Sequence, residues 1–127
     1  MRFYAKRRLR LRIYGISQTI ANDQTAESTA IKVGALTIDP MGYLATLNGQ
    51  SLDLTRTEFM LLNLLVRNAG RAFSRDYLLD SVWGQPYVEG DRGVDNAILR
   101  LRKKLGTLGE AIETVWGIGY RWQLPNL

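Results

Sequence analysis

The pattern of hydrophobic and polar positions changes near Ala30. Residues 15–30 are mostly small and polar, which is typical of a linker. From Ile31 onward, apolar and β-branched residues recur with a strand-like period. We therefore predict a basic N-terminal segment with a flexible, disordered linker over 1–30, followed by one folded domain over 31–127.

Turn residues divide the first part of this domain into strands. We expect one strand over 33–38 and a turn at 39–42, where the sequence is Asp-Pro-Met-Gly. The pair Asn48-Gly49 predicts a type I′ hairpin, because both of its central positions need a positive φ. The period of two then continues to Leu54, so the domain is predicted to begin with a small antiparallel sheet.

Three helices are predicted next. Thr55 and Glu58 have the capping-box spacing, in which each side chain accepts a hydrogen bond from the backbone N–H of the other residue. Asp91 is a candidate cap for the third helix, and Gly106 is its expected terminator. The predicted helical segments are 59–66, 74–84 and about 94–105.

A second pair of strands closes the domain. Residues 112–116 and 120–124 are rich in strand-forming residues and flank the glycine turn Gly117-Ile118-Gly119. The order of strands, three helices and hairpin predicts an α+β fold. We interpret it as a winged helix-turn-helix domain, with the second and third helices as the helical pair and the hairpin as the wing.

Composition excludes most enzyme chemistry. The chain of 127 residues contains no histidine and no cysteine. It therefore lacks a Ser-His-Asp triad, a Cys-His pair, a disulfide and a His/Cys zinc site, and we predict neither an enzyme nor a cofactor. No apolar run is long enough to span a bilayer and no secretory signal is recognisable, so we expect a cytoplasmic protein without a membrane partner.

Positive charge is unevenly distributed. The formal net charge is +5, from 17 basic and 12 acidic residues. Six of the basic residues lie in 1–12, so 13–127 carries 17 − 6 = 11 bases against 12 acids. A nucleic-acid site in the folded domain would therefore have to concentrate its cations on one face.

The third predicted helix has such a face. Its apolar stripe consists of Val94, Ile98, Leu101 and Leu105. A helix of this length fits the major groove, where arginine pairs with guanine and asparagine with adenine. The opposite face presents Asn96, Leu99, Arg100 and Lys103, with Arg102 and Lys104 on the flanks, where they are better placed for phosphates.

Two other interpretations remain open. A basic helix face is often only solvated surface. The near-neutral charge of 13–127 also fits a protein-interaction module on a winged-helix scaffold, since a fold does not fix a function. The basic N-terminal segment is either a DNA-contacting arm or an unordered terminus.

Several ordered motifs resemble one bacterial family. They are Leu54-Thr-Arg-Thr-Glu-Phe59, Phe73-Ser-Arg75 with Val82-Trp-Gly84, Val94-Asp95 with Leu101-Arg-Lys103, and Thr114-Val-Trp-Gly-Ile-Gly-Tyr-Arg121. From residue 31 onward the chain is similar to the effector domain of OmpR/PhoB-type response regulators. The resemblance implies a four-stranded N-terminal sheet, a three-helix core and a C-terminal wing. It also implies transcriptional regulation by tandem dimers on promoter direct repeats.

Family roles carry over by position. Asn96 and Arg100 match base-contacting positions, and 85–92 matches a loop that meets RNA polymerase in some members. Leu99 matches a phosphate-contacting position but has no charge, so we expect a thymine methyl as its partner. Ala97 and Trp116 replace a histidine and an arginine that are common in the family. Expected DNA-backbone contacts are Arg92, Arg102, Lys104, Trp83, Arg75, Thr114, Tyr120 and Arg121, with Lys103 a further base contact.

No part of 1–30 is long enough to be the family's receiver domain. We favour the interpretation that the chain is a fragment, because 15–30 has the composition of an interdomain linker. A receiver domain and a sensor kinase are then expected partners of the longer protein.

Overall fold

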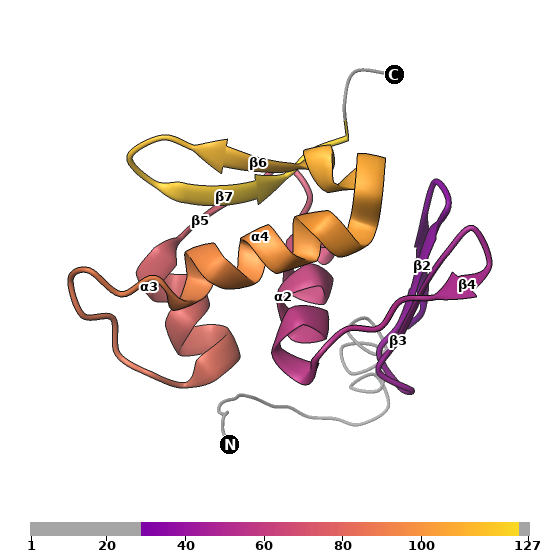
Figure 1. Cartoon of the computed structure of the whole chain (residues 1–127), viewed down its shortest axis with the longest axis horizontal. Helices are drawn as coiled ribbons and strands as arrows, with labels where there is room; N and C mark the ends of the chain where they lie inside the picture. Colours follow the sequence, from indigo (N-terminus) through magenta and orange to yellow (C-terminus); the bar gives the residue numbers. More distant parts are fainter. Residues whose placement is uncertain (1–28, 125–127) are drawn as a thin grey trace, which may run out of the picture.

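A computed structural model describes residues 29–124, so most of the predicted N-terminal segment and linker lies outside the described residues. Figure 1 shows helices at the centre, with one small sheet beside them and a second sheet above them. The predicted α+β winged helix-turn-helix fold is confirmed. Within 29–124, no helix is long and apolar enough to cross a membrane.

The N-terminal sheet has four antiparallel strands in the order β1-β2-β3-β4. They are β1 (Ile31–Val33), β2 (Leu36–Asp39), β3 (Leu44–Leu47) and β4 (Gln50–Ser51). The predicted single strand over 33–38 was wrong, because Gly34 takes a φ of 59° and turns the chain between β1 and β2. The Asn48-Gly49 hairpin is confirmed, with φ values of 54° and 80°. The strand period also overestimated β4, which ends before Leu52.

The first helix, α2 (Arg56–Arg67), begins at the predicted capping box. The Glu58 backbone N–H donates to Thr55 Oγ1 at 3.2 Å, and the Thr55 N–H donates to Glu58 Oε1 at 3.0 Å. Leu61, Leu62 and Leu65 are fully buried, which makes α2 the central helix of the core.

The predicted helix over 74–84 is two helical pieces. Ser74 caps α3 (Arg75–Leu78), and a π-helical turn, η1 (Leu79–Trp83), continues it. Leu78 of α3 and Leu79 of η1 are both buried, so both pieces contribute to the core. Gly84 ends the segment with a φ of 68°, a conformation that glycine adopts at little cost.

The helix α4 (Gly93–Leu105) confirms the predicted third helix, and its stripe of Val94, Ile98, Leu101 and Leu105 is buried. Asp91 is not the N-cap residue, which is Arg92, but its Oδ1 does accept from the first helical N–H at 2.8 Å. Gly106 follows the helix with a φ of 65°. A 3-10 segment, η2 (Gly106–Ala111), then leads to the C-terminal sheet.

The C-terminal sheet contains the predicted hairpin and one unpredicted strand. Its order is β5 (Ala72–Ser74), β7 (Gly119–Trp122) and β6 (Ile112–Val115). The run Ala72-Phe73-Ser74 is too short to be recognised as a strand without its partner. Because β7 lies in the middle, it pairs with neighbours on both sides and ties the wing to the start of α3.

A partly buried carboxylate, Asp95, joins this sheet to α4. Tyr120 of β7 donates its hydroxyl to Asp95 Oδ1, and Arg75 Nε donates to the same oxygen at 2.8 Å. The Arg75 guanidinium also lies 5.1 Å from the centre of the Tyr120 ring. Burial by itself would raise the pKa of Asp95, but the hydrogen bonds from Tyr120 and Arg75 outweigh it, so the pKa is lowered.

The two wing glycines differ in role, which leads to a first prediction. Gly117 has a φ of 80° and open space around it, whereas a Cβ on Gly119 would lie 1.9 Å from the carbonyl oxygen of Phe73. Gly119→Ala should therefore force β5 and β7 apart and cost about 3 kcal/mol of unfolding free energy. Gly117→Ala should cost only about 1 kcal/mol. Urea denaturation measures both, and equal losses would contradict this assignment.

A second prediction concerns Asp95 and pH. Because its pKa is lowered in the folded state, its stabilising contribution is present at neutral pH and is lost as pH falls through that lowered value. Asp95→Asn should cost about 2 kcal/mol at pH 7 and should weaken the pH dependence of stability between pH 7 and 3. Urea denaturation across this range is the measurement, with the exposed Asp80→Asn as a charge-matched control. A variant whose pH dependence equals that of the wild type would contradict it.

Candidate nucleic-acid interface

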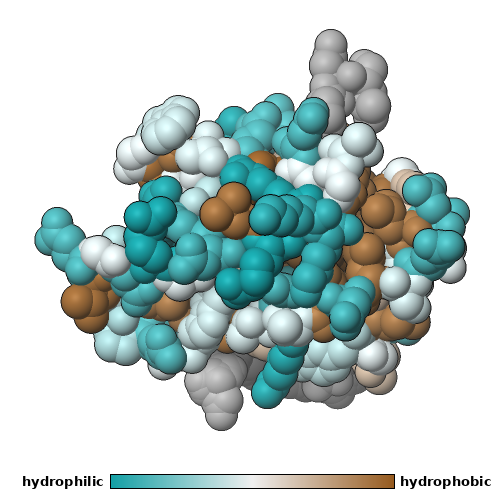
Figure 2. Space-filling model, in the orientation of Figure 1, coloured by the Kyte–Doolittle hydropathy of each residue, from teal (hydrophilic) through white to brown (hydrophobic). Residues whose placement is uncertain are grey.

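The outward face of α4 is a polar ridge. The four side chains predicted to face outward, Asn96, Leu99, Arg100 and Lys103, are all exposed. The Arg100 side chain is 55% exposed and Leu99 is 53% exposed. In the orientation of Figure 1, α4 crosses the centre of the molecule, and Figure 2 shows hydrophilic side chains over most of it. The ridge has the shape and donors that a helix needs to contact base edges in the major groove.

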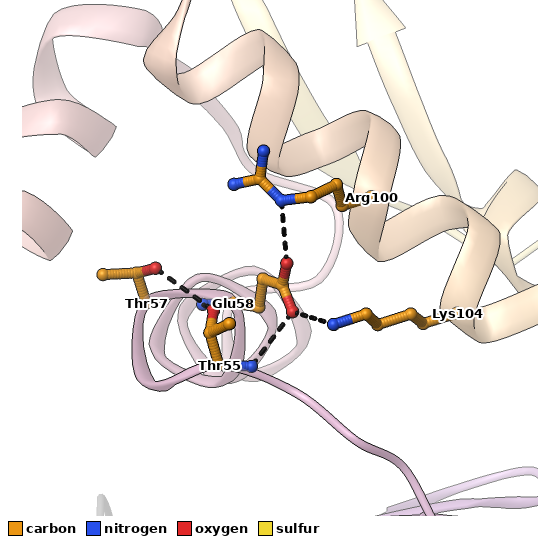
Figure 3. A network of polar contacts seen from close by, with 5 residues as sticks. All are labelled: Thr55, Thr57, Glu58, Arg100 and Lys104. Carbon is orange, nitrogen blue, oxygen red and sulfur yellow. Dashed lines mark hydrogen bonds and ion pairs between the residues drawn. The ribbon is translucent and has the colours of Figure 1, made fainter.

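A buried glutamate lies beneath this ridge. Glu58 has no exposed surface, yet it accepts from two cations of α4. Arg100 Nε lies 3.0 Å from Oε2, and Lys104 Nζ lies 2.6 Å from Oε1 (Figure 3). Burial would raise the pKa of Glu58, but hydrogen bonds from Lys104, the Thr55 N–H and Arg100 together lower it. The carboxylate is therefore charged and holds α2 against α4.

Sequence reasoning missed this role of Glu58. It assigned the residue only to the capping box, and the two cations are 42 and 46 positions away along the chain. No local pattern connects them. The signal in the sequence is only indirect, since an acidic residue at the third position of a buried helix needs a cationic partner if its charge is to be buried.

Arg102 joins the ridge to the wing. Its Nε and Nη2 donate to the Ile112 carbonyl at 3.1 and 2.6 Å, and Nη2 also donates to Thr114 Oγ1 at 3.0 Å. The structure thus brings Arg102 and Thr114, both predicted to contact the DNA backbone, into contact with each other. Both are partly exposed, so these contacts position them without closing them off from solvent.

The tip of the wing is apolar and exposed. Trp116 is 89% exposed and Ile118 is 51% exposed, on either side of the Gly117 turn. Figure 1 shows this tip above the N-terminal end of α4. Farther along the hairpin, Arg121 Nη2 lies 2.8 Å from Glu113 Oε1, which neutralises part of the charge of that predicted contact.

The remaining predicted residues divide into exposed and enclosed groups. The Arg92 side chain is 71% exposed and only 3.4 Å from Asp95 Oδ2, whereas Lys104 is 34% exposed and held by Glu58. Tyr120 is 5% exposed, so its ring supports the interface from inside. Arg75 belongs to the same Asp95 cluster, and Trp83 packs partly buried against the core.

The acids nearest the ridge are turned inward, and the most exposed cations face outward. Glu58 and Asp95 are each engaged by cations, while Lys103 has no ion-pair partner among residues 29–124. Within that part of the chain, no group of three or more acidic, histidine or cysteine side chains has the arrangement of a metal site. The exposed side chains of the ridge offer hydrogen-bond donors and positive charge, which suit an anionic, grooved partner.

Comparison with known proteins identifies the same domain. The family model described as "Transcriptional regulatory protein, C terminal" matches residues 49–122. The transcriptional regulatory protein VxrB of Vibrio cholerae is 43% identical over 105 residues, which cover 83% of this chain and 42% of that protein. The phosphate regulon transcriptional regulatory protein PhoB of Pseudomonas aeruginosa is 44% identical over 98 residues, or 76% of this chain and 42% of that protein. The chain spans less than half the length of these curated relatives.

Solved structures give the same result. The DNA-binding domain of RstA from Klebsiella pneumoniae, crystallised in complex with the RstA box, has a TM-score of 0.69 and 40% identity over 75% of this chain and 97% of that one. The DNA-binding domain of CpxR from E. coli has a TM-score of 0.71 and 36% identity over 76% of this chain and 98% of that one. The chain therefore belongs to the OmpR/PhoB-type family of transcriptional regulatory proteins and contains its winged-helix DNA-binding effector domain.

Proposed function

We propose that this domain binds double-stranded DNA by placing α4 in the major groove and the wing beside it. The observation that carries the proposal is the exposed row of Asn96, Arg100 and Lys103 on a helix whose other face is buried. The helix is fixed by its buried stripe, so these donors have defined positions. That the RstA domain was crystallised with its DNA box supports the same use of a similar fold.

The base-contacting side chains are Asn96, Leu99, Arg100 and Lys103. Asn96 has the paired donor and acceptor that match adenine N6 and N7, and Arg100 has donors for guanine O6 and N7. Leu99, more than half exposed among these polar groups, offers apolar contact to a thymine methyl.

The DNA backbone is met at the edges of the ridge and along the wing. At the start of α4, the Arg92 side chain is 71% exposed and available to a phosphate, and Arg102, Thr114 and Arg121 extend the contact onto the hairpin. Lys104 and Arg75 add positive potential from partly enclosed positions, while Trp83 and Tyr120 shape the surface that meets the sugar-phosphate chain. At the wing tip, Trp116 packs against sugar, and Gly117 and Gly119 keep the turn narrow.

The longer assembly follows from the family. We propose binding to promoter direct repeats as a tandem dimer, in the bacterial cytoplasm, under the control of a receiver domain and a sensor kinase. The length difference between this chain and its curated relatives supports a further domain. The 85–92 loop is a candidate contact for RNA polymerase, because it presents Tyr87 and Val88, which are 40% and 65% exposed.

The proposal predicts two separable effects on DNA binding. A preferred duplex is first selected from a random pool with the full chain and with a chain lacking 1–30. Arg100→Ala should then cost about 1–3 kcal/mol on that site and relax the choice of one base pair. Arg102→Ala should weaken binding to all sequences alike and lower the salt slope by about 1.

Arg56→Ala, which removes the same charge at the start of α2, is the control for net charge. Affinity titrations at two salt concentrations are the measurement. Arg100→Ala with an unchanged base preference would refute the base-contacting role. If mixed-sequence duplex shows no salt-dependent binding, the alternative of a protein-interaction module is favoured instead.

The loop proposal gives another prediction. The double variant Tyr87→Ala, Val88→Ser should leave affinity for the selected duplex unchanged, because neither side chain is among the proposed DNA contacts. Transcription in vitro from a promoter that carries the selected site should lose the effect of the wild-type protein. If the double variant regulates transcription as the wild type does, the polymerase contact is refuted.

A further inference from the structure

We propose that Glu58 is a specificity-determining positioning residue, which holds Arg100 by its Nε so that only the two terminal Nη groups face the DNA. This inference rests on the proposed function, because it concerns how Arg100 meets a base. Glu58 itself does not touch the duplex, since it is fully buried. Its effect acts through the direction of the Arg100 guanidinium.

The carboxylate is held at a fixed place. Glu58 is the third residue of α2, and its Oε1 accepts from the Thr55 backbone N–H at 3.0 Å as half of the capping box. The same oxygen accepts from Lys104 Nζ, so Oε2 is the oxygen that faces Arg100 (Figure 3). Rotation of the carboxylate would break the cap and the lysine contact together. The two bonds to Oε1 therefore fix the direction in which Oε2 faces Arg100.

Arg100 is fixed at two points. Its backbone belongs to α4, and its Nε donates to Oε2 at 3.0 Å. Neither Nη group has a partner within residues 29–124. Figure 3 shows both terminal nitrogens directed away from Glu58. A guanidinium that is held by Nε has only its Nη1 and Nη2 donors left for a paired contact with guanine O6 and N7.

The charges also fit this role. One carboxylate faces two cations, so the group of three retains one positive charge although an acid lies beneath the ridge. The acid is buried and the Arg100 side chain is half exposed, so DNA phosphates meet the cation and not the anion. If the ion pair served only to pack α2 on α4, the terminal nitrogens of Arg100 would not need to be exposed to solvent.

Glu58→Gln tests the inference with little structural change. Glutamine also serves at this position of a capping box, so the helix start is retained while the charge is lost. We expect the affinity ratio between the selected site and a site with the Arg100 base pair changed to fall about fivefold. Binding to mixed-sequence duplex should be equal or tighter, because one negative charge has been removed. The exposed Glu110→Gln makes the same charge change and should leave the ratio unaltered.

A double-variant cycle separates positioning from general damage. In an Arg100→Ala background, Glu58→Gln should have no further effect on the affinity ratio. If it lowers the ratio there as well, or if it leaves the ratio unchanged in the wild type, the inference is overturned. If Arg100→Ala itself leaves base preference intact, the proposed function fails at Arg100, which is a different result.

A second variant covers the case in which Glu58→Gln does not fold. Glu58→Asp keeps the charge but withdraws the carboxylate from Nε by one methylene, so it should lower the same ratio. Circular dichroism and thermal unfolding establish that the variants compared are folded at the assay temperature. An aspartate variant that folds and discriminates as the wild type does would also overturn the inference.

Discussion

A helix can offer defined donors to a groove only if it cannot roll about its own axis. In this domain, the burial of Val94, Ile98, Leu101 and Leu105 provides that constraint. A rotation of α4 about its axis by one residue, or about 100°, would expose apolar side chains and would bury cations. Both changes cost free energy. The ridge, its contacts with the wing and its pairing with α2 all depend on this one orientation.

Two carboxylates, one fully buried and one partly buried, then refine the position of α4. Asp95 connects it to Arg75 and Tyr120 at one end, and Glu58 connects it to α2 near the other. Each carboxylate accepts hydrogen bonds from cations or a hydroxyl of neighbouring elements. Each therefore has a defined position and is not a free surface charge. The domain can therefore be close to neutral over 13–127 and still present a basic face, because its acids near that face point inward.

The features that were predictable from sequence are those with local causes. The Asn48-Gly49 turn, the Thr55–Glu58 capping box and the α4 stripe each follow from residues within a few positions of one another. The other features need contacts between distant segments. β5 exists only because β7 pairs with it, and the Glu58 pair with Arg100 spans 42 positions. The four strands of the N-terminal sheet were predicted by the family resemblance, whereas periodicity alone predicted β1 and β2 as one strand.

The central place of β7 has a consequence for the DNA. Since β7 is hydrogen-bonded to β5 on one side and to β6 on the other, the base of the hairpin is tied to the start of α3. Arg102 and Tyr120 fasten it to α4 as well. These contacts restrict how far the distance between α4 and the wing can change. We therefore expect the duplex to adapt instead, by bending or by changing groove width, so that its deformability joins its base sequence in selecting the site.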